Sequence, residues 1–248
     1  MAAIASALRL GQRATIRGRR FLNLHEYQSA QILAAGGVTV PRGIAATSVE
    51  ECVKAAEQLK GDEVVIKSQI LAGGRGLGTF TNGFQGGVHV IPKSKTQEYA
   101  EKMIGQTLVT KQSGPEGKPV NTVLMAEKMD LVNEMYFAIL LDRAFGGPVV
   151  IACAEGGTSI EDLAEKYPEK IKKVPIDIVA GMTDQQASDI VDALEISGSK
   201  PAAIEQVKAL YGVFRDSDCT MVEVNPLAED SNGTLIAADA KLGFDDNT

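Results

Sequence analysis

The stretch VVIKSQILAGGRGLG, residues 64–78, indicates the fold and the chemistry of this chain more clearly than any other. Val64 to Ile66 form a continuous β-branched run, which predicts a buried strand, and Lys67 ends that run. A lysine at this place must reach solvent or meet an anion, and a glycine-rich loop follows directly. Loop amides without side chains can close around phosphate, so Lys67 and the loop predict a phosphate site.

A plain turn is the alternative for these residues. The loop lacks the Gly-Lys-Ser/Thr ending of a Walker A motif and the GxGxxG spacing of a dinucleotide fingerprint. Glycines that serve turns, with a lysine at a strand edge, would give the same letters. On this stretch alone both readings stay open.

Outward from this stretch, helices and strands alternate, which predicts an α/β fold class. A helix is expected at Leu22–Ala35, with Asn23 as N-cap and Glu26 completing a capping box. The other expected helices are 48–59 with Ser48 as cap, 96–104, 160–166, 184–193 and 201–216. The expected strands are 38–40, 64–67, 88–91, a pair at 108–110 and 123–125, a central strand at 135–142 with its hairpin partner at 149–154, and a last hairpin of 220–224 and 234–239.

A second candidate site lies in the last hairpin. Alternation places Glu223 and Asn225 on one face of a strand, and Asp239 follows on the next strand. The register could bring Asn225 and Asp239 side by side. Such hard oxygen ligands, with nucleotide phosphates, are what Mg²⁺ requires. A polar hairpin face with solvated carboxylates is the alternative.

A third candidate is the pair Glu127 and Glu134, which follow and precede apolar strands. An amino group of a base or a ribose hydroxyl needs such acceptors. Ordinary surface solvation explains the two residues equally well when they are taken alone.

The composition excludes several functions. No stretch reaches the roughly 18 apolar residues of a membrane helix, so no membrane span is expected. The first twenty residues hold five arginines and no acidic residue, which predicts a mitochondrial transit peptide at 1–20, with a disordered basic tail as the alternative. Without those five arginines the formal charge of −7 becomes −12, which argues against nucleic-acid binding. Cys52, Cys153 and Cys219 are expected to be reduced core residues.

Four motifs, in order, resemble the succinyl-CoA synthetase (succinate–CoA ligase) β subunit. They are Asn23–Gln28, Val65–Gly76, Glu223–Leu227 and Asp239–Gly243. The resemblance runs from about residue 21 to residue 248 and implies an ATP-grasp fold, of class α/β (α+β), in which two subdomains hold a nucleotide between them. It predicts a smaller inserted subdomain at about 41–126 and a larger one of about 21–40 plus 127–248.

The same resemblance implies roles for eight residues. Those that would bind the nucleotide, ATP or GTP, are Lys67, Gly74, Arg75, Gly76, Glu127 and Glu134, and those that would hold Mg²⁺ are Asn225 and Asp239. Lys67 would contact the phosphates, the loop would cover them, and the two glutamates would meet the base and the sugar.

The implied reaction interconverts succinate, CoA and nucleoside triphosphate with succinyl-CoA, nucleoside diphosphate and phosphate in the tricarboxylic acid cycle. The phosphoryl group passes through a histidine of a partner α subunit, so no catalytic residue is expected in this chain, and neither His25 nor His89 has that role. Pro41 resembles ADP-forming members, which favours ATP over GTP.

Several alternatives remain within this resemblance. Family β subunits continue into a second α/β domain, so a fragment or a truncated paralogue is expected. A related acyl-CoA ligase, of the malate–CoA ligase or ATP-citrate lyase type, is the alternative enzyme. A truncated, non-catalytic nucleotide-binding partner is the alternative of another class. The expected compartment is the mitochondrial matrix, with a hydrogenosome as the alternative.

Overall fold

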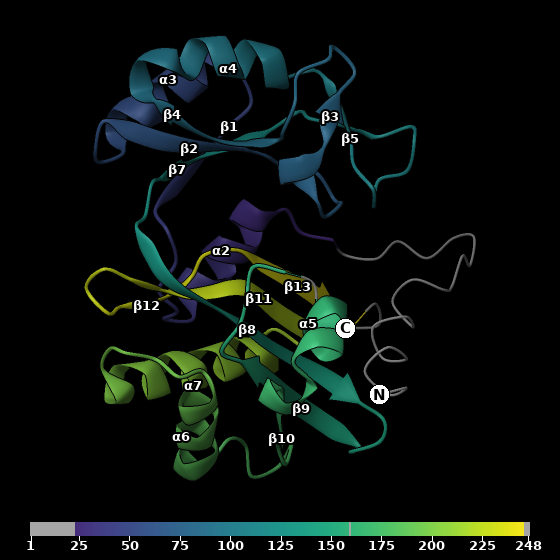
Figure 1. Cartoon of the computed structure of the whole chain (residues 1–248), viewed down its shortest axis with the longest axis vertical. Helices are drawn as coiled ribbons and strands as arrows, with labels where there is room; N and C mark the ends of the chain where they lie inside the picture. Colours follow the sequence, from purple (N-terminus) through teal and green to yellow (C-terminus); the bar gives the residue numbers. More distant parts are fainter. Residues whose placement is uncertain (1–22, 159, 246–248) are drawn as a thin grey trace. The chain divides into compact units, whose positions relative to one another are not determined.

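The computed structural model describes residues 23–158 and 160–245, and these residues form two compact units. Unit 1 contains Ser29–Val40 and the described chain from Asp130 onward, together with Asn23 and Leu24. Unit 2 contains His25–Gln28 and Pro41–Met129. In Figure 1, unit 2 carries the labels α3 and α4, and unit 1 carries α6 and α7. The expected targeting segment, residues 1–20, lies outside the described residues.

Unit 2 is built on a four-stranded antiparallel sheet with the order β1-β7-β2-β4. Its strands are β1 (Gly43–Ala46), β2 (Glu63–Ser68), β4 (Val88–Pro92) and β7 (Val123–Glu127). Helices α3 (Val49–Gln58) and α4 (Thr96–Met103) cover one face of this sheet (Figure 1). The smaller elements are the three-stranded sheet of β3 (Thr79–Phe80), β5 (Thr107–Val109) and β6 (Lys118–Pro119), and the 3-10 turns η1 (Arg75–Leu77) and η2 (Lys93–Lys95).

Alternation along β2 separates a core face from an opposite face. Val64 and Ile66 are fully buried with Met125 of β7 in the core beneath α3 and α4. Val65 and Lys67 are half-buried and point the other way. The strand predicted at 64–67 is therefore confirmed, and Lys67 is kept out of the core.

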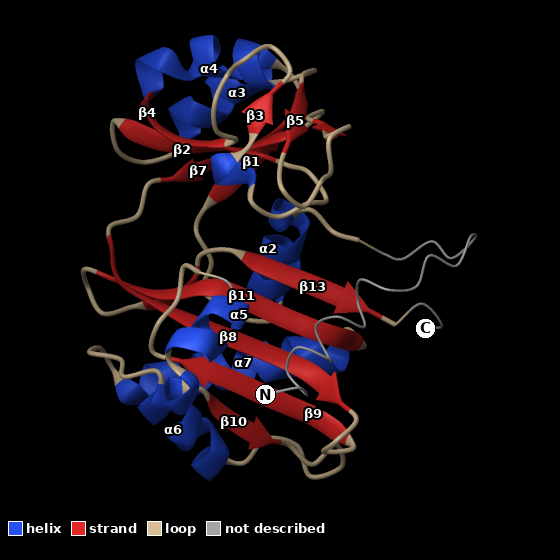
Figure 2. Ribbon diagram, turned by 45° about the vertical axis from the view of Figure 1, so that its right-hand side comes forward, coloured by secondary structure: helices blue, strands red, loops and turns tan. Residues whose placement is uncertain are grey.

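Unit 1 is built on a six-stranded antiparallel sheet, in which β10-β9-β8-β11-β12 form one path and β13 pairs with β11. Its strands are β8 (Leu131–Asp142), β9 (Gly147–Cys153), β10 (Lys172–Pro175), β11 (Cys219–Asp230), β12 (Leu235–Ala237) and β13 (Ala240–Phe244). Figure 2 shows the strands running side by side, with helices on both faces.

The two faces of this sheet pack against different helices. One face meets α2 (Glu26–Ala35), α6 (Asp184–Ala193) and α7 (Lys200–Asp216) through a large apolar core. The other meets α5 (Ile160–Lys166), which the 3-10 turn η3 (Pro168–Lys170) follows. The predicted central strand, its hairpin partner and the helices predicted at 160–166, 184–193 and 201–216 are confirmed. The last hairpin has its predicted turn, but its strands differ from the prediction: β12 ends at Ala237, and residues 221–224 pair with β13.

Two predictions about pairing and strands are wrong. Residues 108–110 and 123–125 do not pair, because β5 pairs with β3 and β6 whereas β7 lies between β1 and β2. Val123 to Ala126 are buried on both sides, and such a strand gains most in the centre of a sheet. Val38–Val40 is no strand; the amide of Thr39 donates to the side chain of Gln206 instead.

The first helix also begins later than predicted. Asn23 is not its cap but forms an isolated bridge with Gly243. At the start of α2, Gln28 Oε1 accepts from the amide of His25 at 2.9 Å. Glu26 completes no capping box, because its carboxylate is engaged by two cations far along the chain. The cap predicted at Ser48 is confirmed, since its hydroxyl accepts from the amide of Glu51.

The three cysteines are buried free thiols, as predicted. Burial raises the pKa of Cys52 to about 12 and that of Cys219 to about 11, and it also raises the pKa of Cys153. None of the three thiols is therefore activated. Within the described residues, no helix is long and apolar enough to cross a membrane.

Candidate functional site

A buried carboxylate joins two cations in unit 2. Lys67 Nζ lies 2.7 Å from Glu26 Oε1, and Arg75 Nη1 lies 2.8 Å from Glu26 Oε2. The side chains of Lys67, Arg75 and Glu26 are only 17%, 12% and 6% exposed, so this is not a solvated surface pair. Strand β2 supplies the lysine, η1 supplies the arginine, and the first residue of α2 supplies the carboxylate.

The surroundings keep Glu26 ionised. Gln69 Nε2 donates to Glu26 Oε2 at 3.2 Å, and Arg75 Nη1 also donates to the carbonyl of Ser68 at 2.9 Å. Burial alone would raise the pKa of Glu26, but the charges of Lys67 and Arg75 and the bonds from Lys67 and Gln69 hold it below its ordinary value.

The glycine-rich loop beside this cluster contains glycines of two kinds. Gly74 has a φ of +74°, which only glycine adopts without strain. A Cβ at Gly78 would lie 2.9 Å from the carbonyl of Val109, so packing explains that glycine. A Cβ at Gly76 would meet no described atom within 4 Å, and its φ is not in the left-handed region. Neither packing nor backbone geometry accounts for Gly76.

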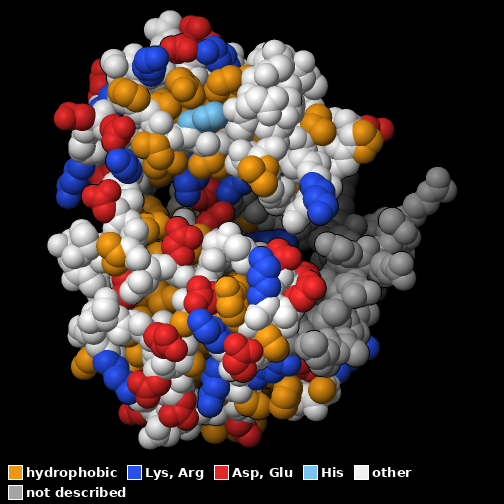
Figure 3. Space-filling view, in the orientation of Figure 1, with side chains coloured by type: hydrophobic (Ala, Val, Ile, Leu, Met, Phe, Trp, Pro, Cys, Tyr) orange, Lys and Arg blue, Asp and Glu red, His pale blue; other side chains and the backbone are white. Residues whose placement is uncertain are grey.

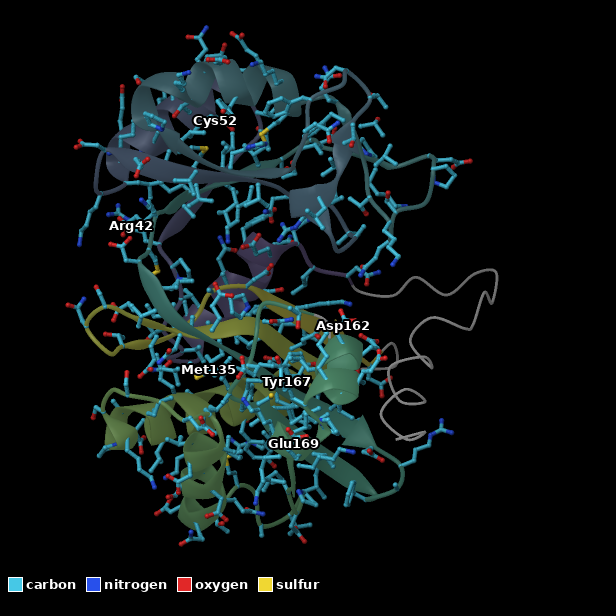
Figure 4. All side chains as sticks on the ribbon, in the orientation of Figure 1. Arg42, Cys52, Met135, Asp162, Tyr167 and Glu169 are labelled. Carbon is cyan, nitrogen blue, oxygen red and sulfur yellow. The ribbon has the colours of Figure 1, made fainter. Side chains whose placement is uncertain are left out.

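Glu127 has structural partners of its own at the end of β7. Its Oε1 accepts from the amide of Lys60 at 3.1 Å and lies 3.7 Å from Arg42 Nη1. Arg42, labelled in Figure 4, precedes β1, and its carbonyl accepts from the amide of Glu127 at 2.9 Å. These bonds tie together the chain entering β1 and the chain leaving β7.

Asn225 and Asp239 are neighbours in unit 1. The amide of Asn225 donates to the carbonyl of Asp239 at 2.9 Å, next to the paired residues Val224 and Ala240 of β11 and β13. The adjacency predicted from the hairpin is therefore present. The side chain of Asn225 also binds the loop before α5, accepting from the amide of Gly157 at 2.9 Å and donating to the carbonyl of Thr158 at 2.8 Å.

The oxygens of these two residues suit a hard divalent cation. Both supply carbonyl or carboxylate oxygens, the ligands that Mg²⁺ prefers. The described part of the chain contains no group of three or more His, Cys, Asp or Glu that could hold a metal ion. A Mg²⁺ ion held by Asn225 and Asp239 would thus draw its remaining ligands from water and phosphate, as is usual for this ion.

Glu134 and Glu223 share the sheet face that meets α5. Tyr136, which lies between them and is buried, donates its hydroxyl proton to Glu223 Oε1 at 3.0 Å. Burial and the charge of Glu223 raise the pKa of Tyr136, so this phenol stays a neutral donor. A Cβ on Gly157 would lie 2.5 Å from Glu134 Oε2, which places the loop before α5 directly against this carboxylate. One face of unit 1 thus brings together Glu134, Glu223 and Asn225.

Comparison with known proteins places the chain in a family. Residues 23–229 match the ATP-grasp domain. The chain belongs to the ATP-grasp family. It is 58% identical over 231 residues to the mitochondrial ADP-forming succinate–CoA ligase β subunit of Arabidopsis thaliana, covering 92% of this chain and 55% of that protein. It is 46% identical over 231 residues to the mitochondrial GDP-forming β subunit of Dictyostelium discoideum, covering 92% of this chain and 55% of that protein.

This ATP-grasp chain therefore spans about half the length of the curated relatives it matches. Among solved structures it resembles the ATP citrate lyase of Methanothrix soehngenii, determined with citrate and coenzyme A, with a TM-score of 0.67. That likeness covers 92% of this chain and 52% of the other, at 18% sequence identity. It shows the fold alone.

Sequence reasoning about the ATP-grasp site missed two groups. It assigned Glu26 to a helix cap, although the structure places this carboxylate on Lys67 and Arg75. It also missed the loop at Gly157, which contacts both Glu134 and Asn225. The paired glycines Gly156 and Gly157 were the available signal, since a Cβ on Gly156 would lie 2.5 Å from the backbone of Met135.

Proposed function

We propose that this chain binds a Mg-nucleotide and passes a phosphoryl group to or from its partner, as part of a succinate–CoA ligase β subunit. The observation that carries the proposal is the pair of nearly buried cations, Lys67 and Arg75, beside a loop whose Gly76 neither packing nor backbone geometry explains. A glycine that neither packing nor backbone geometry requires suits a position where a ligand approaches the backbone closely. The identity of 58% to a succinate–CoA ligase β subunit supports the same function.

The proposed roles divide the site by chemistry. Lys67 and Arg75 bind phosphate oxygens, and Gly74 to Gly76 offer backbone amides to them. Glu127 and Glu134 accept hydrogen bonds from the base and the sugar. Figure 3 shows Lys and Arg interspersed with Asp and Glu on the visible face rather than gathered in one broad basic patch.

Asn225 and Asp239 are proposed as the Mg²⁺ ligands. Bound Mg²⁺ would neutralise charge that develops on the phosphate oxygens. Asn225 is held for this task by its two bonds to the loop before α5, which fix the direction of its side-chain amide. Its oxygen accepts one of these bonds and retains a second lone pair.

Phosphoryl transfer itself needs an acceptor, which we place on a histidine of a partner α subunit. The two histidines of this chain do not suit that role. His25 has a buried Nδ1 without a hydrogen-bond partner in the described chain, and burial and Arg75 lower its pKa. His89 Nε2 lies 2.7 Å from the carbonyl of Gly86, and its ring packs on Phe84 and Tyr99. The catalytic contribution of this chain is therefore positioning and charge neutralisation.

ATP is the proposed nucleotide, with GTP as the second choice. The higher identity to an ADP-forming relative favours ATP, although a GDP-forming relative is also 46% identical. The proposed substrates of the complete enzyme are succinate and CoA, and the proposed compartment is the mitochondrial matrix, where these two relatives are named.

Calorimetric titration of residues 21–248 with Mg-ATP, and separately with Mg-GTP, tests the proposal. Binding of ATP at least about 10-fold tighter than GTP, a difference of about 1.4 kcal/mol, is the expected result. Addition of an α subunit and γ-labelled ATP should then label a histidine of the α subunit. Nucleotide binding without labelling would instead favour a non-catalytic nucleotide-binding partner.

A further inference from the structure

The Glu26 carboxylate lies at the centre of the cationic cluster of unit 2. One of its oxygens accepts from Lys67 at 2.7 Å, and the other accepts from Arg75 at 2.8 Å. Gln69 orients this carboxylate, since its amide donates to Glu26 at 3.2 Å while its oxygen accepts from the amide of Tyr27 at 3.3 Å. The carboxylate is thus fixed from the helix side and from the strand side.

We propose that Glu26 is a positioning residue for the triphosphate of the bound nucleotide: it holds the Lys67 ammonium and the Arg75 guanidinium as one preformed pair. This inference rests on the proposed function. Long flexible side chains lose rotamer freedom when they are ordered, and a pair that is already ordered avoids that cost at binding. The bond to Glu26 uses only one of the three N–H donors of the Lys67 ammonium.

A competing explanation of Glu26 predicts the opposite change in nucleotide affinity when this carboxylate is removed. If Glu26 merely neutralised the cations, its removal would strengthen phosphate binding, because the local charge would rise. If Glu26 positions them, removal weakens binding, because the carbamoyl group of glutamine presents an N–H donor to one of two cations. The substitution Glu26→Gln keeps the size of the side chain, so it separates the two explanations.

The test is competitive acetylation of Lys67 in the full chain, read by peptide mass spectrometry with increasing Mg-ATP. The variants are wild type, Glu26→Gln and Glu98→Gln. Glu98 is the matched control, because it lies 2.7 Å from Lys102 in the same unit but in an exposed ion pair. We expect Mg-ATP to protect Lys67 in the wild type and in Glu98→Gln at the same concentration. In Glu26→Gln the concentration for half-protection should rise about 10-fold.

A second measurement tests whether the loss of affinity depends on the phosphates of the nucleotide. The loss of affinity in Glu26→Gln should be largest for Mg-ATP, smaller for Mg-ADP and within about 2-fold for AMP. A disturbed fold would lower all three affinities together. Equal or tighter Mg-ATP binding in Glu26→Gln overturns the inference and leaves the proposed function standing.

The ion pair is also tested without nucleotide. Acetylation of Lys67 in the absence of ATP should be several-fold faster in Glu26→Gln than in wild type, and an unchanged rate overturns the positioning role. Absence of ATP protection in wild type would count against the proposed function itself. If Glu26→Gln does not fold, Gln69→Leu replaces it, because this substitution removes the donor that orients Glu26. It should also raise the Mg-ATP concentration for half-protection of Lys67, and an unchanged concentration overturns the inference.

Discussion

Glu229 is expected to be the buried carboxylate of unit 1 whose removal lowers the free energy of unfolding most. It is 1% exposed and accepts from the amide and hydroxyl of Ser197, the amide of Gly198 and the side chain of Asn133, all at 2.7–3.0 Å. These bonds join the end of β11 to the connection between α6 and α7. The perturbation is Glu229→Ala, with the isosteric Glu229→Gln beside it.

The expected cost follows from those four donors. A hydrogen bond to a charged group contributes about 1.5–3 kcal/mol. Ser197 and Asn133 are exposed, so their donors regain water when the carboxylate is removed. We therefore expect Glu229→Ala to lower the free energy of unfolding by about 3 kcal/mol, and Glu229→Gln, which keeps the packing and one acceptor, by about 2 kcal/mol.

The pH dependence of this effect has a definite sign. Burial opposes ionisation of Glu229, but its hydrogen bonds prevail and hold its pKa below the ordinary value. Its stabilisation is therefore full above the unfolded-state pKa of about 4.3 and is lost as the pH falls through the folded-state pKa. Glutamine cannot titrate, so the stability difference between wild type and Glu229→Gln should be constant near neutral pH and shrink below about pH 4.

Urea unfolding followed by circular dichroism measures this difference, and amide exchange at Ser197 and Gly198 gives a local readout. The matched control is Glu165→Ala on the exposed side of α5, where a change within about 0.5 kcal/mol is expected. A cost below about 1 kcal/mol for Glu229→Ala, or a difference that widens in acid, would refute this account of the carboxylate.

Four further predictions, three substitutions and one labelling test, concern single residues. Gly74→Ala puts a side chain at a φ of +74° with no described atom within 4 Å, so strain alone should cost about 1–2 kcal/mol in urea unfolding. Gly198→Ala would place its Cβ against the carbonyl of Gly233, and this overpacking should cost about 3 kcal/mol; a cost near that of Gly74→Ala would contradict the close approach. Asp239→Ala should abolish Mg-nucleotide binding with an unchanged circular dichroism spectrum, and unchanged affinity would remove the metal assignment. Cys52, with a pKa of about 12, should resist iodoacetamide in the native protein at about pH 8 and react in urea, so rapid native labelling would count against its burial.

The fold was predictable where neighbours in the sheet are neighbours in the chain. The apolar run of β8 and its short turn to β9 predicted a hairpin, and β11 with β12 did the same. The pairing of β7 was not predictable in this way. Its partners β1 and β2 lie far back in the chain, and only the burial of Val123 to Ala126 on both faces explains its central place.

The same distinction separates the parts of the site. Asn225 and Asp239 belong to one hairpin region, so alternation and register sufficed to bring them together. Glu26 and Lys67 are 41 residues apart, and Glu26 also fitted a helix cap near Asn23. A helix cap and a distant ion pair were both possible for the Glu26 carboxylate. The ion pair formed because two nearly buried cations need an anion more than one helix end does.

Lys67 is expected to reach solvent or to meet an anion, and the anion that it meets within the chain is Glu26. Arg75 brings a second cation to the same carboxylate. The plain-turn alternative explains Gly78 by packing and Gly74 by its φ, but it does not explain Gly76. An anion that approaches the loop at Gly76 would account for that glycine.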